Sequence, residues 1–185
     1  MPRASLHHEP SGLVPIARHY IRDVVYGAND GIITTFAVVA GVTGGALSPR
    51  AVLIVGAANL FADGLSMGVG NYLSIRSNES ARAAEDLPEE EARPARHGAA
   101  TFLAFFLAGA IPLAPYVLAF TDGQRLACSV ILTFAALFGV GSLRSMVTID
   151  RWWTAGLEML GLGAAVALAA YASGALVSLV VPGFG

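Results

Sequence analysis

The chain has 185 residues, of which 55% are hydrophobic and only 13% are charged, and its formal net charge is −2. Soluble domains carry about 25% charged residues. This composition therefore excludes an ordinary soluble domain and indicates an all-α integral membrane protein, for which no nucleic-acid partner is expected.

The N-terminal segment, residues 1–22, precedes the first long apolar run. It is polar up to Gly12 and does not resemble a signal peptide. Between Leu13 and Arg22, apolar residues recur at a helical spacing among Arg18, His19 and Arg22. This pattern predicts a short helix that lies at the membrane surface.

Five apolar runs follow, and each is long enough to cross a hydrocarbon core of about 30 Å as a helix. They cover residues 24–46, 51–75, 99–120, 127–147 and 155–181. Backbone groups in lipid must be hydrogen-bonded internally, which favours helices. We therefore expect a transmembrane domain of five helices over residues 23–181, with a kink or unwinding in the third span at Pro112 and Pro115.

The loops predict the orientation of the chain. All basic residues are arginines, and all of them except Arg50 and Arg125 fall on the side that holds the N-terminus. The positive-inside rule then places the N-terminus in the cytoplasm and the C-terminus outside or in a lumen. The acidic linker, residues 76–98, is cytoplasmic. Its cluster Glu89–Glu91 is most simply solvated, and weak capture of cations near the membrane is the alternative.

Two carboxylates lie within the first two apolar runs, Asp30 in the first and Asp63 in the second. A charged side chain at the centre of a bilayer costs at least about 2.5–3.5 kcal/mol, so such residues usually bind an ion or relay a proton. The second run also places polar or thioether side chains at intervals of four residues, on one face of a helix. This stripe consists of Asn59, Asp63, Met67 and Asn71.

The donor atoms of the stripe indicate the class of ion. Carboxylate and amide oxygens together with a thioether suit Fe²⁺ or Mn²⁺ better than Mg²⁺ or Ca²⁺. Carboxylates must lose a proton to bind a metal, so protons and metal ions compete for one site. That competition is a basis for metal–proton exchange. The transported ion is the substrate, and neither a cofactor nor an enzymatic activity is expected.

Simpler readings of the same residues stay open. Met67 alone could be a packing residue, and Asn59 and Asn71 could hydrogen-bond between helices. Glu158 follows an interfacial pair of tryptophans, so it is placed with equal weight in the ion path or at the interface. Asp23, at the membrane entrance, is expected to be solvated or paired with Arg18 or Arg22.

Two segments carry a family resemblance. The segment DVVYGANDGIITTFAVVAG, residues 23–41, resembles the first span of the vacuolar iron transporter family, and NLFADGLSMGVGNYLS, residues 59–74, resembles its second. The fifth span is similar around Gly156 and Tyr171. The resemblance is specific over residues 23–80 and loose over the third and fourth spans.

The resemblance implies a five-span homodimer that moves Fe²⁺, and often Mn²⁺, out of the cytosol in exchange for protons. The family's aspartate and methionine on the ion path map onto Asp30 and Met67. Its second span often carries a glutamate where this chain has Asn59 or Asn71, and Asp63 could compensate. The short linker resembles the nodulin-like branch, which lacks the cytoplasmic metal-binding domain.

The hypothesis is therefore a homodimeric metal–proton antiporter in the lipid bilayer of a bacterial plasma membrane, with a vacuole-type membrane as the alternative. A transporter of another solute, such as Mg²⁺ or an organic cation, is a second possibility. A third is a membrane scaffold without transport activity that binds an iron-storage or sensing protein through the linker.

Overall fold

The structure is a computed structural model that describes residues 5–8, 10–118, 121–145 and 149–180. The described residues form six α-helices and no β-strand, apart from one isolated bridge between Ser5 and Glu89. This confirms the all-α prediction. The helices are α1 (Leu13–Gly44), α2 (Pro49–Ala84), α3 (Pro94–Gly109), α4 (Ala114–Val117), α5 (Asp122–Arg144) and α6 (Trp152–Val180).

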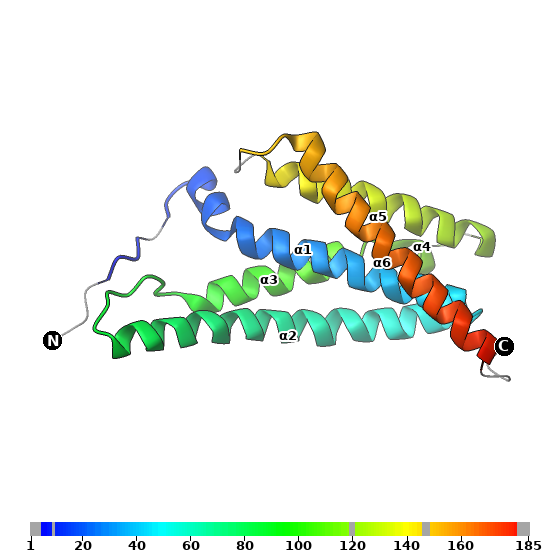
Figure 1. Cartoon of the computed structure of the whole chain (residues 1–185), viewed down its shortest axis with the longest axis horizontal. Coiled ribbons are helices and arrows are strands. Elements are labelled where there is room, and N and C mark those ends of the chain that lie inside the picture. The colour runs from blue at the N-terminus through cyan, green and yellow to red at the C-terminus, as the bar shows by residue number, and fades with distance from the viewer. Residues whose placement is uncertain (1–4, 9, 119–120, 146–148, 181–185) are drawn as a thin grey trace.

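The helices run roughly along one axis and form an elongated bundle (Figure 1). Four of them, α1, α2, α5 and α6, are long and apolar enough to cross a membrane, as an integral membrane protein requires. Helix α3 has only 16 residues, so the described part of the third predicted span, residues 99–118, contains most of α3 and the short α4. The fifth crossing therefore stays a prediction.

The break between α3 and α4 lies where the sequence predicts a kink. Pro112 and Pro115 are both fully buried there, and proline cannot donate the backbone hydrogen bond that continues a helix. The hydroxyl of Ser129 on α5 donates a hydrogen bond of 2.7 Å to the carbonyl of Pro112. Irregular backbone at membrane depth is tolerated when it is buried in protein and hydrogen-bonded in this way.

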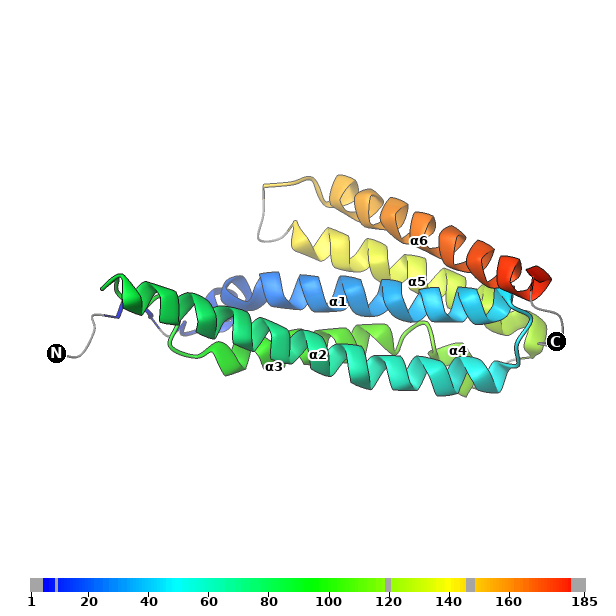
Figure 2. The same ribbon diagram turned by 60° about the horizontal axis from the view of Figure 1, so that its bottom comes forward.

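Helix α1 packs against α2, α3, α5 and α6 (Figure 2). Its contact with α3 depends on Gly31: a Cβ built there would lie 2.3 Å from the carbonyl oxygen of Phe105. The two backbones approach so closely because the glycine has no side chain. On α2, Gly68 makes the same kind of contact with Gly98 of α3.

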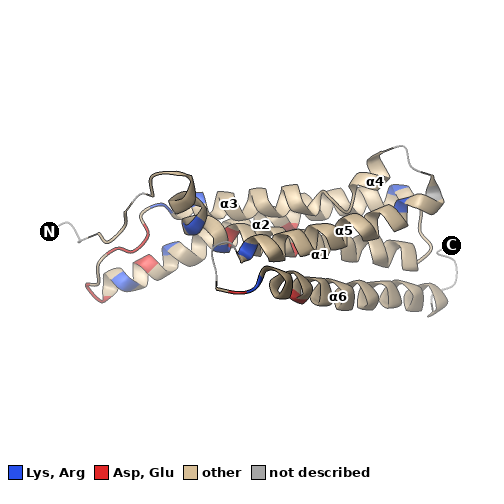
Figure 3. Cartoon of the chain, turned by 90° about the horizontal axis from the view of Figure 1, so that it is seen from above, with Lys and Arg blue, Asp and Glu red and all other residues tan. Residues whose placement is uncertain are grey.

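Charged residues gather at one end of the bundle (Figure 3). This end, which we call the linker end, holds the start of α1, the end of α2 and the start of α3. Arg50, in the first turn of α2, and Arg125, in the first turn of α5, lie at the opposite end. The arginines among the described residues are thus divided between the two ends as the sequence predicts.

Two segments differ in extent from the expectation. Residues 13–22 are the first turns of α1 and not a separate helix, and α2 continues past the predicted end of the second span. The non-helical connection is therefore shorter than the predicted linker and comprises residues 85–93. From here on, the word linker refers to this shorter segment. Residues 1–4 and the predicted span ends at positions 120, 147 and 181 lie outside the described residues.

Candidate functional site

Two carboxylates lie near each other on α1 and α2, within the apolar stretches of both helices. Asp30 of α1 and Asp63 of α2 are close enough for their charges to interact. Asp30 is partly buried, whereas Asp63 is exposed on the outer surface of α2. Thr34 uses its hydroxyl to bond the backbone carbonyl of Asp30, so this bond leaves the oxygens of the Asp30 carboxylate available.

A second polar layer lies nearer the linker end. The Asp23 carboxylate accepts a hydrogen bond of 2.8 Å from Nδ2 of Asn71, and its other oxygen contacts Nδ1 of His97. The same Asn71 nitrogen lies 2.8 Å from the hydroxyl of Thr101. Asp23 is only 2% exposed, so this network joins α1, α2 and α3 inside the protein.

The two layers are in register on antiparallel helices. Asp23 and Asp30 are seven residues apart on α1, and Asp63 and Asn71 are eight apart on α2. Two helical turns, or about 11 Å, therefore separate the layers along both helices. The polar residues of α1 and α2 thus form two layers at matching heights along the two helices.

The remaining members of the predicted stripe have different surroundings. Met67 is partly buried and packs against the apolar cluster that contains Phe36 and Phe105. Asn59 lies one turn from Asp63, and its amide nitrogen is buried without a hydrogen-bond partner among the described residues. A metal ion binds the oxygen of an amide and not its nitrogen, so this nitrogen does not test the role of Asn59, which stays a predicted ligand. Asn71 is an interhelical hydrogen-bonding residue.

Glu158 does not join these layers. Its side chain is 59% exposed and forms an ion pair of 2.8 Å with Arg144 at the end of α5. The structure therefore brings together Asp30 and Asp63, connects Asn71 to Asp23, and places Glu158 between α5 and α6 at the linker end.

Sequence reasoning missed Asp23 and His97. Of the two alternatives for Asp23, solvation is wrong, whereas pairing with Arg22 is confirmed, since the guanidinium lies 3.7 Å from the carboxylate. The available signal was its position seven residues before Asp30, on the same face of α1. No local signal marks His97, because its partner lies 74 residues away in the sequence.

Comparison with known proteins agrees with the resemblance. "Vacuolar iron transporter 2" of Oryza sativa subsp. japonica is 27% identical over 84% of this chain and 86% of its own length. "Vacuolar iron transporter homolog 5" of the same organism is 31% identical over 72% of this chain and 70% of its own length.

A third relative is similar over a shorter segment. "Vacuolar iron transporter" of Toxoplasma gondii is 48% identical over 38% of this chain, and the match spans only 24% of that relative. The model of the VIT family matches residues 21–91 and 81–175. Because these matches cover most of its length, the chain belongs to the VIT family.

Proposed function

We propose that this chain transports divalent iron across a membrane along the polar layers between α1 and α2. VIT family members are transporters and not enzymes, and the relatives are named as vacuolar iron transporters. The main support for this proposal is that Asp30 and Asp63 lie near each other on two helices that are long enough to cross a membrane. Such a pair can replace part of the hydration shell of a dication.

The transport is an exchange of metal for protons. Each carboxylate must be deprotonated to bind the metal, so protons that arrive from the opposite side displace the ion. Asp30 and Met67 are the primary ligands, and Asp63 and Asn59 complete the set with oxygen atoms. The mixture of carboxylate, amide and thioether donors also suits Mn²⁺.

The direction of transport follows from the proposed orientation. With α3 and α4 together serving as a fifth crossing, the linker end faces the cytosol and the C-terminus faces outside or a lumen. The gathering of arginines at the linker end supports this orientation. Metal then leaves the cytosol, across a bacterial plasma membrane or, as the alternative, a vacuole-type membrane.

A homodimer explains the exposure of Asp63. A carboxylate on a lipid-facing surface is unfavourable, and Asp63 is exposed on α2 together with Ser66 and Gly70, which follow it by one and two turns on the same side of the helix. A second copy packed against this face would cover the carboxylate and separate the ion path between α1 and α2 from the lipid.

Reconstitution in proteoliposomes tests the proposal. Vesicles with an acidic interior contain a pH-sensitive dye, and Fe²⁺ is added outside with ascorbate. We expect Fe²⁺ entry accompanied by a rise of internal pH, a smaller or equal response to Mn²⁺, and none to Mg²⁺. Flux without a pH change would remove the exchange mechanism, and absence of any metal flux would remove the transport proposal.

A further inference from the structure

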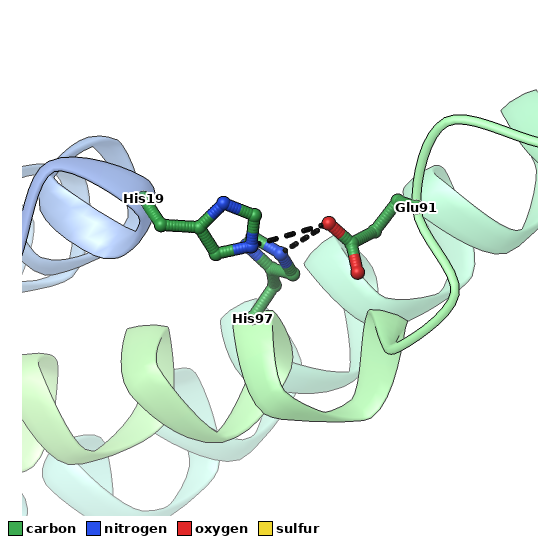
Figure 4. A group of neighbouring side chains, drawn as sticks. All are labelled: His19, Glu91 and His97. Carbon is green, nitrogen blue, oxygen red and sulfur yellow. Dashed lines mark ion pairs between the residues drawn. The ribbon is translucent and has the colours of Figure 1, made fainter. Parts of the chain in front are cut away.

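Three potential metal ligands from separate chain segments meet at the linker end. His19 comes from the first turns of α1, Glu91 from the linker and His97 from the first turn of α3. Nε2 of His97 lies 3.0 Å from Oε2 of Glu91, and Nε2 of His19 lies 3.3 Å from the same oxygen. The three ligand atoms lie within 4.8 Å of one another, and both rings point toward the carboxylate (Figure 4).

The two histidine nitrogens lack hydrogen bonds although they are buried. Neither Nε2 atom has a hydrogen-bond partner among the described residues, because the contacts to Glu91 do not have hydrogen-bond geometry. The His97 side chain is only 7% exposed. A buried polar atom without a hydrogen bond is costly, and a metal ion between the three ligands would remove that cost.

Asp23 fixes the orientation of His97. The carboxylate contacts Nδ1 of the ring and is itself held by Asn71. When the neutral ring donates its Nδ1 proton to this carboxylate, Nε2 carries the lone pair and can bind a metal ion on the side of Glu91. Histidines that bind metals are commonly oriented by a carboxylate in this way.

Hydrogen bonds to the linker also fix the position of Glu91. The carboxylate of Glu79 on α2 accepts hydrogen bonds of 3.0 Å from the backbone amides of both Glu90 and Glu91. Oε1 of Glu91 also accepts a hydrogen bond of 2.8 Å from the backbone amide of Arg93, which holds the carboxylate in place through its other oxygen.

The cluster is accessible to an ion and has a further donor close by. It borders a cavity of about 630 Å³ whose lining includes the side chains of Asn78, Glu79 and Glu90. On the other side, the N-terminal segment is attached to the linker by a hydrogen bond of 2.7 Å from the Leu6 amide to the Glu89 carbonyl. This attachment places Nδ1 of His7 3.4 Å from the second oxygen of Glu91.

The donor set decides the class of ion. Two imidazoles and one carboxylate bind first-row divalent transition metals, whereas Mg²⁺ and Ca²⁺ prefer shells of oxygen. We propose that His19, Glu91 and His97 bind a divalent transition-metal ion at the linker end, with Asp23 as a positioning residue and His7 as a fourth donor. Metal binding at this site does not depend on the proposed transport. Only a role of the site in delivering metal to the ion path rests on the proposed function.

Co²⁺ provides a direct test, because its visible absorption reports nitrogen ligation. Purified protein in detergent is titrated with Co²⁺, and we expect a saturable band. His19→Gln and His97→Gln should weaken Co²⁺ binding at least tenfold, and Asp23→Asn should weaken it about 10–100-fold. His8→Gln is the matched control, since His8 is an exposed histidine and should leave the titration unchanged.

A measurement on the unmodified chain covers the case in which a variant fails to fold. Electron paramagnetic resonance of one equivalent of Cu²⁺ bound to protein with ¹⁵N-labelled histidine should show coupling to imidazole nitrogen. No saturable Co²⁺ band and no such coupling would overturn the proposal and leave an ion-paired cluster. Equal loss in the His8 variant would also overturn it, by showing nonspecific binding.

The outcome is separable from that of the proposed function. Asp30→Asn should abolish Fe²⁺ flux in proteoliposomes while the histidine-dependent Co²⁺ band remains. A Co²⁺ band without any flux in the unmodified chain would contradict transport and keep this site. Flux without a histidine-dependent band would contradict this site and keep transport.

Discussion

The carboxylate of Asp23 contacts Nδ1 of His97, and its other oxygen accepts a hydrogen bond from Asn71. One buried acidic residue thus joins the first three long segments of the chain, α1, α2 and α3. The same contact orients a histidine whose other nitrogen faces Glu91. A structural network and a candidate metal site therefore share a residue.

Asp23→Ala should destabilise the protein strongly. The substitution leaves the Asn71 amide and the His97 ring without their common partner, and removing one member of a buried charged network costs about 3–5 kcal/mol. Unfolding in mixed micelles, followed by circular dichroism, measures this loss. Asp150→Ala is the control: its ion pair with Arg144 is long, at 3.7 Å, and half exposed, so the change should stay within about 1 kcal/mol. Equal effects would contradict the network.

Gly31→Ala should disrupt the contact between α1 and α3. The added Cβ would meet the backbone of Phe105, which cannot rotate away, and overpacking of this kind costs about 1–3 kcal/mol. Gly139→Ala on α5 is the matched control, since nothing lies within 4 Å of a Cβ built there. Thermal unfolding of both variants should show a lower midpoint for Gly31→Ala only.

Asp30→Asn and Met67→Leu should each reduce Fe²⁺ flux at least about tenfold, the usual scale for loss of a metal ligand or its support. Leucine conserves the volume of methionine, so the second variant keeps the packing of Met67 and removes only the thioether. Flux in proteoliposomes at matched protein content measures both. Glu85→Gln, at the exposed C-terminal cap of α2, should transport normally. Full flux in both path variants would exclude this path.

The exposed face of α2 should form the contact between two copies. In a Cys128→Ser background, Ser66→Cys places a thiol one turn from Asp63, on an exposed position of α2. We expect oxidation in membranes to give a covalent dimer. Leu168→Cys, exposed on α6, is the comparison and should remain monomeric. A covalent dimer of the Leu168→Cys variant alone would place the interface at α6, and the dimer would then not account for the exposure of Asp63.

Much of the fold follows from local properties of the sequence. The apolar runs predicted the long helices α1, α2, α5 and α6, because a helix is the way in which a single segment satisfies its own backbone groups in lipid. Pro112 and Pro115 predicted the break between α3 and α4 for an equally local reason. The intramembrane position of Asp30 and Asp63 also followed from the sequence, since a charge in an apolar run is visible without coordinates.

Contacts between distant segments could not be predicted in this way. The four-residue spacing of the stripe predicted Asn71 and Asp63 equally as metal ligands. The structure instead hydrogen-bonds Asn71 to Asp23 and Thr101. Glu158 was placed with equal weight in the path or at the interface, and only the packing of α5 against α6 showed its ion pair with Arg144.

The sequence by itself determined that this protein is helical, belongs in a membrane and carries carboxylates in its apolar segments, because hydropathy and helical periodicity depend on neighbouring residues alone. The tertiary structure decided which of those residues meet. His19, Glu91 and His97 come from three segments, and Asp23 reaches His97 only because glycines such as Gly27 and Gly31 allow α1 and α3 to approach closely. Such convergence depends on backbone packing over long sequence distances, which no local pattern encodes.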